Sequence, residues 1–135
     1  MPVEIRNAQR QVPLDTRRLK RVAQRLLAAL DRSEAVLSIL LTDDRRMAGI
    51  HERWMGEPGP TDVLSFPMGG ETLGDIAISL ETASRRCSGD LFAEVTRVLI
   101  HGLLHLVGHD HAGEKERQRM NREARRLWRA AKERG

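Results

Sequence analysis

The stretch His101-Gly102-Leu103-Leu104-His105-Leu106-Val107-Gly108-His109-Asp110-His111 holds four of the five histidines in this 135-residue chain. His101 and His105 are four residues apart, a spacing that places two side chains on one face of a helix, one turn apart. Gly108 follows three residues later, and glycine tolerates the left-handed backbone with which many helices end. A turn there would bring His111 back toward the other two imidazoles. Three neutral imidazoles and an open fourth position form the ligand set of a catalytic zinc site, so we expect His101, His105 and His111 to bind one metal ion.

The histidine spacing H-x3-H-x2-G-x2-H also occurs in one large class of zinc peptidases. In those enzymes the residue after the first histidine is a glutamate that acts as the general base. This chain has Gly102 at that position, and glycine can neither accept nor donate a proton. The sequence therefore predicts the metal ligands without the base of ordinary peptide hydrolysis. His109 lies two residues from His111, and we expect it to contact substrate or orient a ligand rather than to bind the metal.

Length and composition limit the class of protein. A chain of 135 residues is long enough for one domain with a single core, and no apolar run approaches the roughly 20 residues that span a bilayer. The first residues do not have the pattern of a signal peptide. The single cysteine, Cys87, excludes an internal disulfide and is typical of a reducing compartment. We therefore expect a cytoplasmic protein.

Positive charge is concentrated in the last part of the chain. Residues 114–135 hold nine lysines and arginines and four glutamates, a net charge of +5, whereas the remainder has a net charge of −1. Such a segment can attract phosphate backbones, although a solvated arginine-rich helix face would have the same composition. Only four aromatic side chains are present apart from histidine, so broad base-stacking surfaces are not expected.

Hydrophobic periodicity and capping residues predict the secondary structure. We expect strands at residues 3–12 (an edge strand), 35–41, 63–66 and 73–79, with the last two paired antiparallel because their connection is short. We expect a helix that begins at Asp15 or Thr16, a second from Thr42 or Asp43 to about residue 54, and a short one at 81–87. A long buried helix should follow Asp90 over residues 91–107, and a basic helix should cover about 114–132.

Three segments together resemble the YbeY family, bacterial rRNA maturation factors described as metal-dependent endoribonucleases. They are Pro60-Thr61-Asp62-Val63-Leu64-Ser65-Phe66-Pro67, Leu73-Gly74-Asp75-Ile76-Ala77-Ile78-Ser79 and the histidine stretch from His101 to His111. Their order and spacing also match, and the resemblance covers about residues 35–130.

The resemblance implies a single compact α/β (α+β) domain over residues 1–135. It implies a mixed sheet of about four strands, to which the periodicity adds about five helices, with the metal site in a cleft and its ligands on a central helix. It implies that His101, His105 and His111 hold one Zn²⁺ ion, although Ni²⁺ also accepts imidazole ligands. It further implies processing of small-subunit rRNA, especially the 16S 3′ end, and ribosome quality control. The partners would be rRNA, the small ribosomal subunit and its assembly factors, with no membrane and no DNA.

One residue departs from the family pattern. The family commonly has an arginine just before the glycine that opens the loop at Gly56, and this chain has Met55 there. Methionine cannot pair with a phosphate group or stabilise an anionic transition state. Either another arginine supplies the charge, such as Arg53 or Arg97, or catalysis is weak.

Cleavage of RNA would also require a proton carrier close to the metal. The candidates are Asp62, Asp75, Asp110 and His109. Asp62 and Asp75 can equally be caps of a turn or a strand end, and Asp110 can instead orient an imidazole by a hydrogen bond. Ser65 either lines the cleft or makes a structural hydrogen bond, and we favour the second. Three functions follow: a metal-dependent endoribonuclease acting on single-stranded rRNA, a non-catalytic ribosome assembly factor that retains the site, and a zinc peptidase, which Gly102 disfavours.

Overall fold

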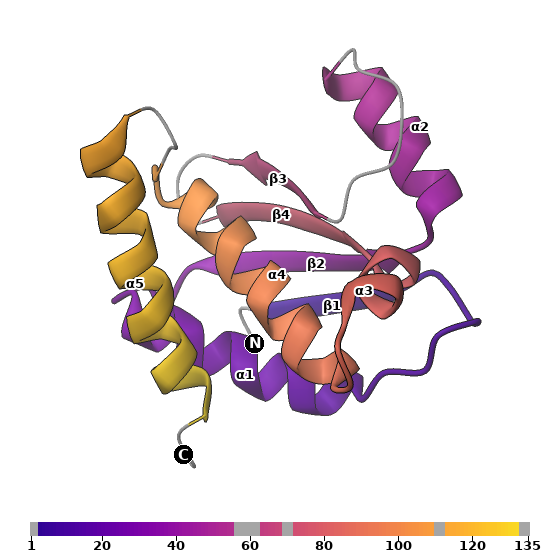
Figure 1. The fold of residues 1–135 in the computed structure, drawn as a ribbon, viewed down its shortest axis with the longest axis horizontal. Helices are drawn as coiled ribbons and strands as arrows, with labels where there is room; N and C mark the ends of the chain where they lie inside the picture. Colours follow the sequence, from indigo (N-terminus) through magenta and orange to yellow (C-terminus); the bar gives the residue numbers. More distant parts are fainter. Residues whose placement is uncertain (1–2, 56–62, 69–71, 110–112, 133–135) are drawn as a thin grey trace.

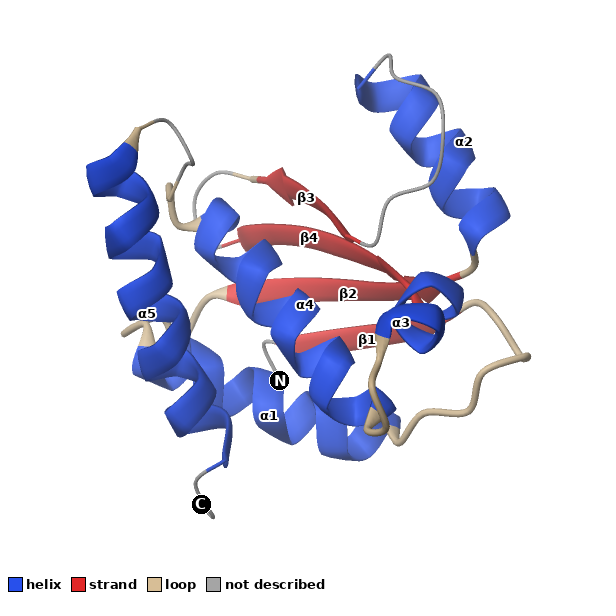
Figure 2. Cartoon of the chain, in the orientation of Figure 1, coloured by secondary structure: helices blue, strands red, loops and turns tan. Residues whose placement is uncertain are grey.

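The computed structural model describes residues 3–55, 63–68, 72–109 and 113–132. The described chain forms one sheet with helices around it (Figures 1 and 2). Its elements are β1 (Val3–Asn7), α1 (Thr16–Ala29), β2 (Val36–Thr42), α2 (Asp44–Met55), β3 (Val63–Pro67), β4 (Thr72–Ser79), α3 (Leu80–Arg86), α4 (Leu91–Leu106) and α5 (Glu114–Lys132).

The four strands form a mixed sheet in the order β1-β2-β4-β3. The strand β2 pairs in parallel with both β1 and β4, and the helical crossovers between these strands allow that arrangement. The strand β3 pairs antiparallel with β4, as the short connection between them predicted. The mixed four-stranded sheet and the α+β class are therefore confirmed.

The main core lies between the sheet and the helices α1, α4 and α5. The helix α4 crosses the sheet face and contacts both β3 and β4, while α1 runs beneath β1 and α5 packs against α1 and α4 (Figure 1). The helix α1 buries an apolar stripe at helical spacing, as expected for an amphipathic helix. Its buried residues are Leu19, Val22, Ala23, Leu26 and Leu27.

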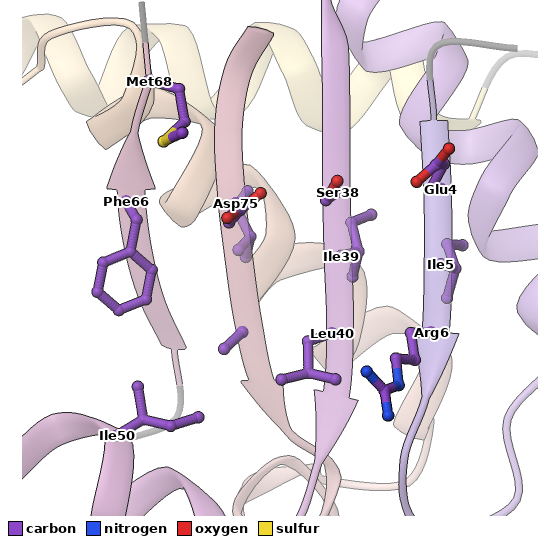
Figure 3. Close-up of a pocket in the computed structure, with 12 residues that line it drawn as sticks. Glu4, Ile5, Arg6, Ser38, Ile39, Leu40, Ile50, Phe66, Met68 and Asp75 are labelled. Atoms are coloured by element: carbon purple, nitrogen blue, oxygen red, sulfur yellow. The ribbon is translucent and has the colours of Figure 1, made fainter.

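The opposite face of the sheet is mostly open. The helix α2 covers one end of it, where Met47 packs with Leu64 and Ala77 in a second, small cluster of buried residues. The remainder of this face carries polar and apolar side chains side by side, among them Arg6 and Asp75 (Figure 3). Because successive side chains of a strand point to opposite faces, these residues point away from α4.

The predicted helix starts are confirmed by their side-chain caps. Asp15 accepts a hydrogen bond from the backbone N–H of Arg18 at 3.0 Å, and Asp43 and Asp90 make the equivalent bonds at 2.9 and 3.3 Å. Such bonds satisfy backbone donors that the first helical turn leaves unpaired.

The predicted first strand, residues 3–12, was wrong beyond Asn7. The side chain of Gln9 donates to Asn7 Oδ1 and to the carbonyl oxygen of Val12, and it accepts from the Val12 N–H, each at 2.9 Å. Ala8 still donates its N–H to the Leu41 carbonyl oxygen of β2 at 2.8 Å. Beyond it these local bonds replace the partners that a neighbouring strand would supply, so the chain leaves the sheet.

In the part of the chain that the structure describes, the helices are too short or too polar to cross a lipid bilayer.

Candidate metal centre

The helix α4 places the histidine stretch on a buried and fixed support. Its sequence is apolar around most of its circumference, and Val95, Leu99 and Leu103 are fully buried. A helix of this kind is held by the core on several sides, so its side-chain directions are well defined. His101 and His105 lie on its more exposed face and are half-buried.

The end of α4 forms the turn that the glycine predicted. Gly108 has φ +99°, a conformation that L-residues rarely adopt. The N–H of His109 bonds to the carbonyl oxygen of Leu104 at 2.9 Å, and the N–H of Gly108 bonds to that of His105 at 3.1 Å. This pair of bonds is a Schellman motif, and it directs the chain away from the helix axis immediately after His105.

The imidazoles of His101 and His105 converge. Their Nε2 atoms are 3.1 Å apart, and the rings lie edge to face with centroids 4.7 Å apart and an interplanar angle of 66°. Two nitrogens bound to one tetrahedral zinc ion at 2.0–2.1 Å are separated by about 3.3 Å. The observed pair therefore fits two ligand positions of such an ion with little movement.

The third predicted ligand, His111, lies outside the described residues, and so does Asp110. Within residues 3–55, 63–68, 72–109 and 113–132, no three histidine, cysteine, aspartate or glutamate side chains come together as a metal site. Metal binding by the three histidines therefore stays a prediction, supported by the geometry of the two that are described.

Gly102 faces the sheet. The Ser65 hydroxyl donates to the Gly102 carbonyl oxygen at 3.1 Å, which agrees with the structural role favoured for Ser65. A Cβ atom at Gly102 would lie 3.0 Å from Ser65 Oγ and 3.2 Å from two carbon atoms of Ile76. The sequence indicated only that a catalytic base is missing here, whereas the structure shows that the position is filled by close packing.

Asp75 and His109 are the two proposed proton carriers that the structure describes. Asp75 is exposed on the open face of the sheet, opposite to α4, so the expectation that it serves the histidines was wrong (Figure 3). The alternation of side chains along β4 explains this, because Ile76 and Ile78 occupy the face toward α4. Asp62 lies outside the described residues.

His109 is half-buried beside α5. Its Nδ1 atom is buried and has no hydrogen-bond partner among the described residues. On α5, the hydrogen bond from Arg126 lowers the pKa of Glu123 against the opposing effect of burial, and the charges of Arg126 and His109 lower it further. His109 therefore lies close enough to α5 to interact with it electrostatically, and its catalytic role stays a prediction.

A groove between α4 and α5 adjoins the histidines and was not foreseen from the sequence. It has a volume of about 600 Å³, and Arg97 and His101 from α4 and Arg125, Trp128 and Arg129 from α5 are among its lining residues. The one available signal was the four-residue spacing of Arg97 from His101 and of Arg125 from Arg129. A larger depression of about 890 Å³ lies on the open face of the sheet, and no histidine is among its lining residues (Figure 3).

Sequence comparison identifies relatives over most of the chain. A family model described as "Endoribonuclease YbeY" matches residues 4–132. A protein named Endoribonuclease YbeY from Anaeromyxobacter sp. (strain Fw109-5) is 46% identical over 84% of this chain and 64% of its own length. Proteins of the same name from Thermobifida fusca and Geobacter sulfurreducens are 44% and 36% identical, over 81% and 95% of this chain and 81% and 94% of their own lengths.

A solved structure has the same fold. The solution structure of TM1509 from Thermotoga maritima aligns with a TM-score of 0.66 over 96% of this chain and 88% of that protein, at 22% sequence identity. The resemblance seen in the three sequence segments is confirmed by the family match and by the relatives. The chain belongs to the YbeY family.

Proposed function

We propose that this protein is a zinc-dependent endoribonuclease that cuts single-stranded rRNA, acts in maturation of the 16S rRNA 3′ end and contributes to ribosome quality control. The observation that carries the proposal is the convergence of His101 and His105, whose Nε2 atoms are 3.1 Å apart at a fixed helix end. Its relatives from three bacteria are named Endoribonuclease YbeY, which supports the choice of RNA as substrate.

The proposal gives each residue of the site a role. His101, His105 and His111 hold one Zn²⁺ ion, and Ni²⁺ is the other divalent ion that this ligand set would accept. A bound zinc ion supplies Lewis-acid chemistry, by which it polarises a phosphate oxygen and lowers the pKa of water. Asp62, Asp110 and His109 are the candidates that take up and release protons during strand cleavage. Rigid attachment of α4 to the core keeps the imidazoles in position.

The proposed setting is the bacterial cytoplasm. The partners are rRNA, the small ribosomal subunit and its assembly factors, and neither a membrane nor DNA is required. The basic segment 114–135, with a net charge of +5, supports an interaction with phosphate groups.

A non-catalytic ribosome assembly factor is the second candidate, and Met55 favours it because no cation stands at the position of the family's arginine. Arg97 is one of the two arginines that could replace the family's arginine. It forms a salt bridge with Glu94 on its own helix, with an N–O distance of 2.5 Å, so its charge is already partly balanced. A zinc peptidase is disfavoured because this chain has Gly102 where the catalytic glutamate would stand, and the position packs closely against Ser65 and Ile76 of the sheet.

Cleavage of a single-stranded rRNA fragment by the purified, zinc-loaded protein tests the proposal. The wild-type protein should cut the fragment, and both chelation of the metal and the change His105→Ala should abolish cutting. His51→Ala is the matched control, since His51 is the one histidine outside the stretch, and it should retain activity. A generic peptide substrate in the same buffer should stay intact.

Each other outcome assigns a different function. RNA binding without metal-dependent cleavage would identify the assembly factor, and peptide hydrolysis would overturn both RNA functions. Met55→Arg should raise the cleavage rate if the absent arginine limits catalysis, whereas an unchanged rate would reject that explanation.

A further inference from the structure

We infer that the groove between α4 and α5 binds the phosphate backbone of single-stranded RNA and leads it to the histidine pair. The inference rests on the proposed ribonuclease function for its choice of RNA. It assigns a substrate path to residues that lie outside the metal centre, and it gives the basic C-terminal helix a defined partner.

Two ridges of side chains form the walls of the groove. On α4, Arg97 and His101 are four residues apart and therefore lie on one face, one turn from each other. On α5, Asn121, Arg125 and Arg129 repeat at the same interval. The two helices pack against each other and run in roughly opposite directions (Figure 1). The α5 ridge therefore extends over about 12 Å, the rise of eight helical residues, and the α4 ridge lies beside it over about 6 Å.

The floor of the groove is apolar and its rim is cationic. The floor is formed by the side chains of Ile100, Leu104, Met120, Ala124 and Trp128. Arg125 and Arg129 of α5 are exposed at the rim, and Arg97 of α4 also lines the groove but is paired with Glu94 of its own helix. No carboxylate is among the described lining residues. Arginine is suited to phosphate groups because its planar fork donates two parallel hydrogen bonds. The charge of the groove is thus complementary to a nucleic-acid backbone.

The dimensions favour one strand over a duplex. Packed helices lie about 8–10 Å apart axis to axis, so the groove between them admits a single chain. His101 lines the groove and its Nε2 atom is 3.1 Å from that of His105, so a backbone lying there would reach the predicted metal position directly. The larger depression on the sheet lacks this connection, and the carboxylates of Glu4 and Asp75 line it.

RNA binding by the metal-free protein tests the inference apart from catalysis. A fluorescently labelled single-stranded oligoribonucleotide is titrated in the presence of a chelator, at several salt concentrations, with anisotropy as the readout. Arg125→Ala/Arg129→Ala should reduce the slope of log K against log salt by about 1.4, because each lost contact with a single strand removes about 0.7. If the variant and the wild type bind equally at 1 M salt, this difference in slope makes the variant bind about 25-fold more weakly than the wild type at 0.1 M salt.

The matched control removes the same charge from another face of α5. Lys115 and Arg119 are exposed on this helix and do not line the groove, so Lys115→Ala/Arg119→Ala should weaken binding by less than about threefold. Arg125→Lys/Arg129→Lys retains the charge and should keep the wild-type salt slope. All four positions are exposed, and thermal unfolding of each variant shows whether its fold is intact.

Trp128 provides a second, independent readout because it lines the groove. In a Trp54→Phe background, addition of the unlabelled oligonucleotide should change the Trp128 emission, and unchanged emission at saturation would contradict the inference. Equal competition by double-stranded RNA would overturn the assignment to a single strand.

The results separate this inference from the proposed function. If the Arg125→Ala/Arg129→Ala variant binds the oligonucleotide with the wild-type affinity and salt slope, the inference is overturned even if the protein cuts RNA. Groove-dependent binding by a protein that never cuts RNA would support the inference and overturn the nuclease proposal.

Discussion

At Gly102 the helix α4 lies so close to the sheet that a side chain would require its neighbours to move. The Cβ of an alanine there would lie 3.0 Å from Ser65 Oγ and 3.2 Å from Ile76 Cδ1 and Cγ2. Gly49, in α2, is the opposite case, because a Cβ at that position would meet nothing within 4 Å. The two helical glycines therefore allow the packing cost to be separated from helix propensity.

We expect Gly102→Ala to lower the free energy of unfolding by about 1 kcal/mol. Overpacking costs about 1–3 kcal/mol, which outweighs the gain of about 1 kcal/mol from replacing a helical glycine. Gly49→Ala should raise the free energy of unfolding by about 1 kcal/mol, since only the propensity changes. Urea unfolding measures both, and a Gly102→Ala variant more stable than wild type would show that the sheet yields easily.

The carboxylate of Asp44 joins the start of α2 to α3. Its Oδ1 atom accepts hydrogen bonds from Ser79 Oγ and Thr82 Oγ1, each at 2.5 Å, and its Oδ2 atom is 2.6 Å from Arg85 Nη1. Burial by itself would raise the pKa of Asp44, but the hydrogen bonds from Ser79, Thr82 and Arg85 and the charge of Arg85 outweigh it and lower that pKa. The ionised form is therefore favoured by the fold.

The change Asp44→Asn should lower the free energy of unfolding by about 2 kcal/mol at pH 7, because hydrogen bonds to a charged group are lost. A carboxyl whose pKa is lower in the folded state stabilises above its unfolded pKa, and that stabilisation is lost as the pH falls through the folded value. The difference between wild type and variant should therefore shrink below about pH 4. Unfolding at pH 7, 5 and 3 measures it.

Asp43→Asn is the control for this experiment. Asp43 caps α2 through the Arg46 N–H, and asparagine caps a helix about as well as aspartate. Its effect should stay within about 0.5 kcal/mol at every pH. An Asp44→Asn effect that is independent of pH would show that ionisation is not involved.

The helix α4 is bounded by glycines that leave the right-handed backbone at both ends. Gly89 precedes the cap Asp90 and has φ +115°, and Gly108 follows the last turn and has φ +99°. A Cβ would meet nothing within 4 Å at either position, so any cost of alanine there comes from the backbone alone. They differ in position, since only Gly108 lies between His105 and His111.

We expect Gly89→Ala and Gly108→Ala to destabilise the fold by a similar amount, about 1–2 kcal/mol, because alanine is strained in this conformation. Only Gly108→Ala should also weaken zinc binding, by about tenfold, because it disturbs the turn that orients the ligands. Competition with a chromophoric chelator measures the affinity. Equal zinc affinities in the two variants would contradict a role of this turn in the metal site.

Across the molecule, α5 connects the last segment of the chain to the first. Arg25 Nη2 on α1 donates to the carbonyl oxygen of Ala131, and Arg126 Nη1 on α5 donates to that of Ala29, each at 2.8 Å. The side chain of Leu127 is fully buried in the core that α5 shares with α1 and α4. The helix that forms one wall of the groove is thus part of the main core.

The change Leu127→Ala should lower the free energy of unfolding by about 3 kcal/mol, the usual cost of a cavity at a buried leucine. The exposed Met68, at 56% relative accessibility, serves as the control, and Met68→Ala should cost less than about 0.5 kcal/mol. Far-UV circular dichroism and Trp128 fluorescence, in a Trp54→Phe background, should report one common unfolding midpoint. An earlier fluorescence transition would mean that α5 detaches as a separate unit.

Local pattern was sufficient for most of the secondary structure. Asp15 and Asp90 predicted the starts of α1 and α4, because capping depends on residues only three positions apart. The strand error after Asn7 arose because the Gln9 side chain satisfies nearby backbone groups, which hydrophobic alternation does not reveal.

Local geometry was likewise sufficient for part of the metal site. The convergence of His101 and His105 and the turn at Gly108 follow from helical geometry and glycine stereochemistry, so the linear order of residues was enough to predict them. The close contact of Gly102 with Ser65, the position of Asp75 on the far face and the arginines of the α4–α5 groove depend on segments distant in the chain. Periodicity records which face of an element is apolar. It does not record which other element covers that face, and packing in three dimensions sets that choice.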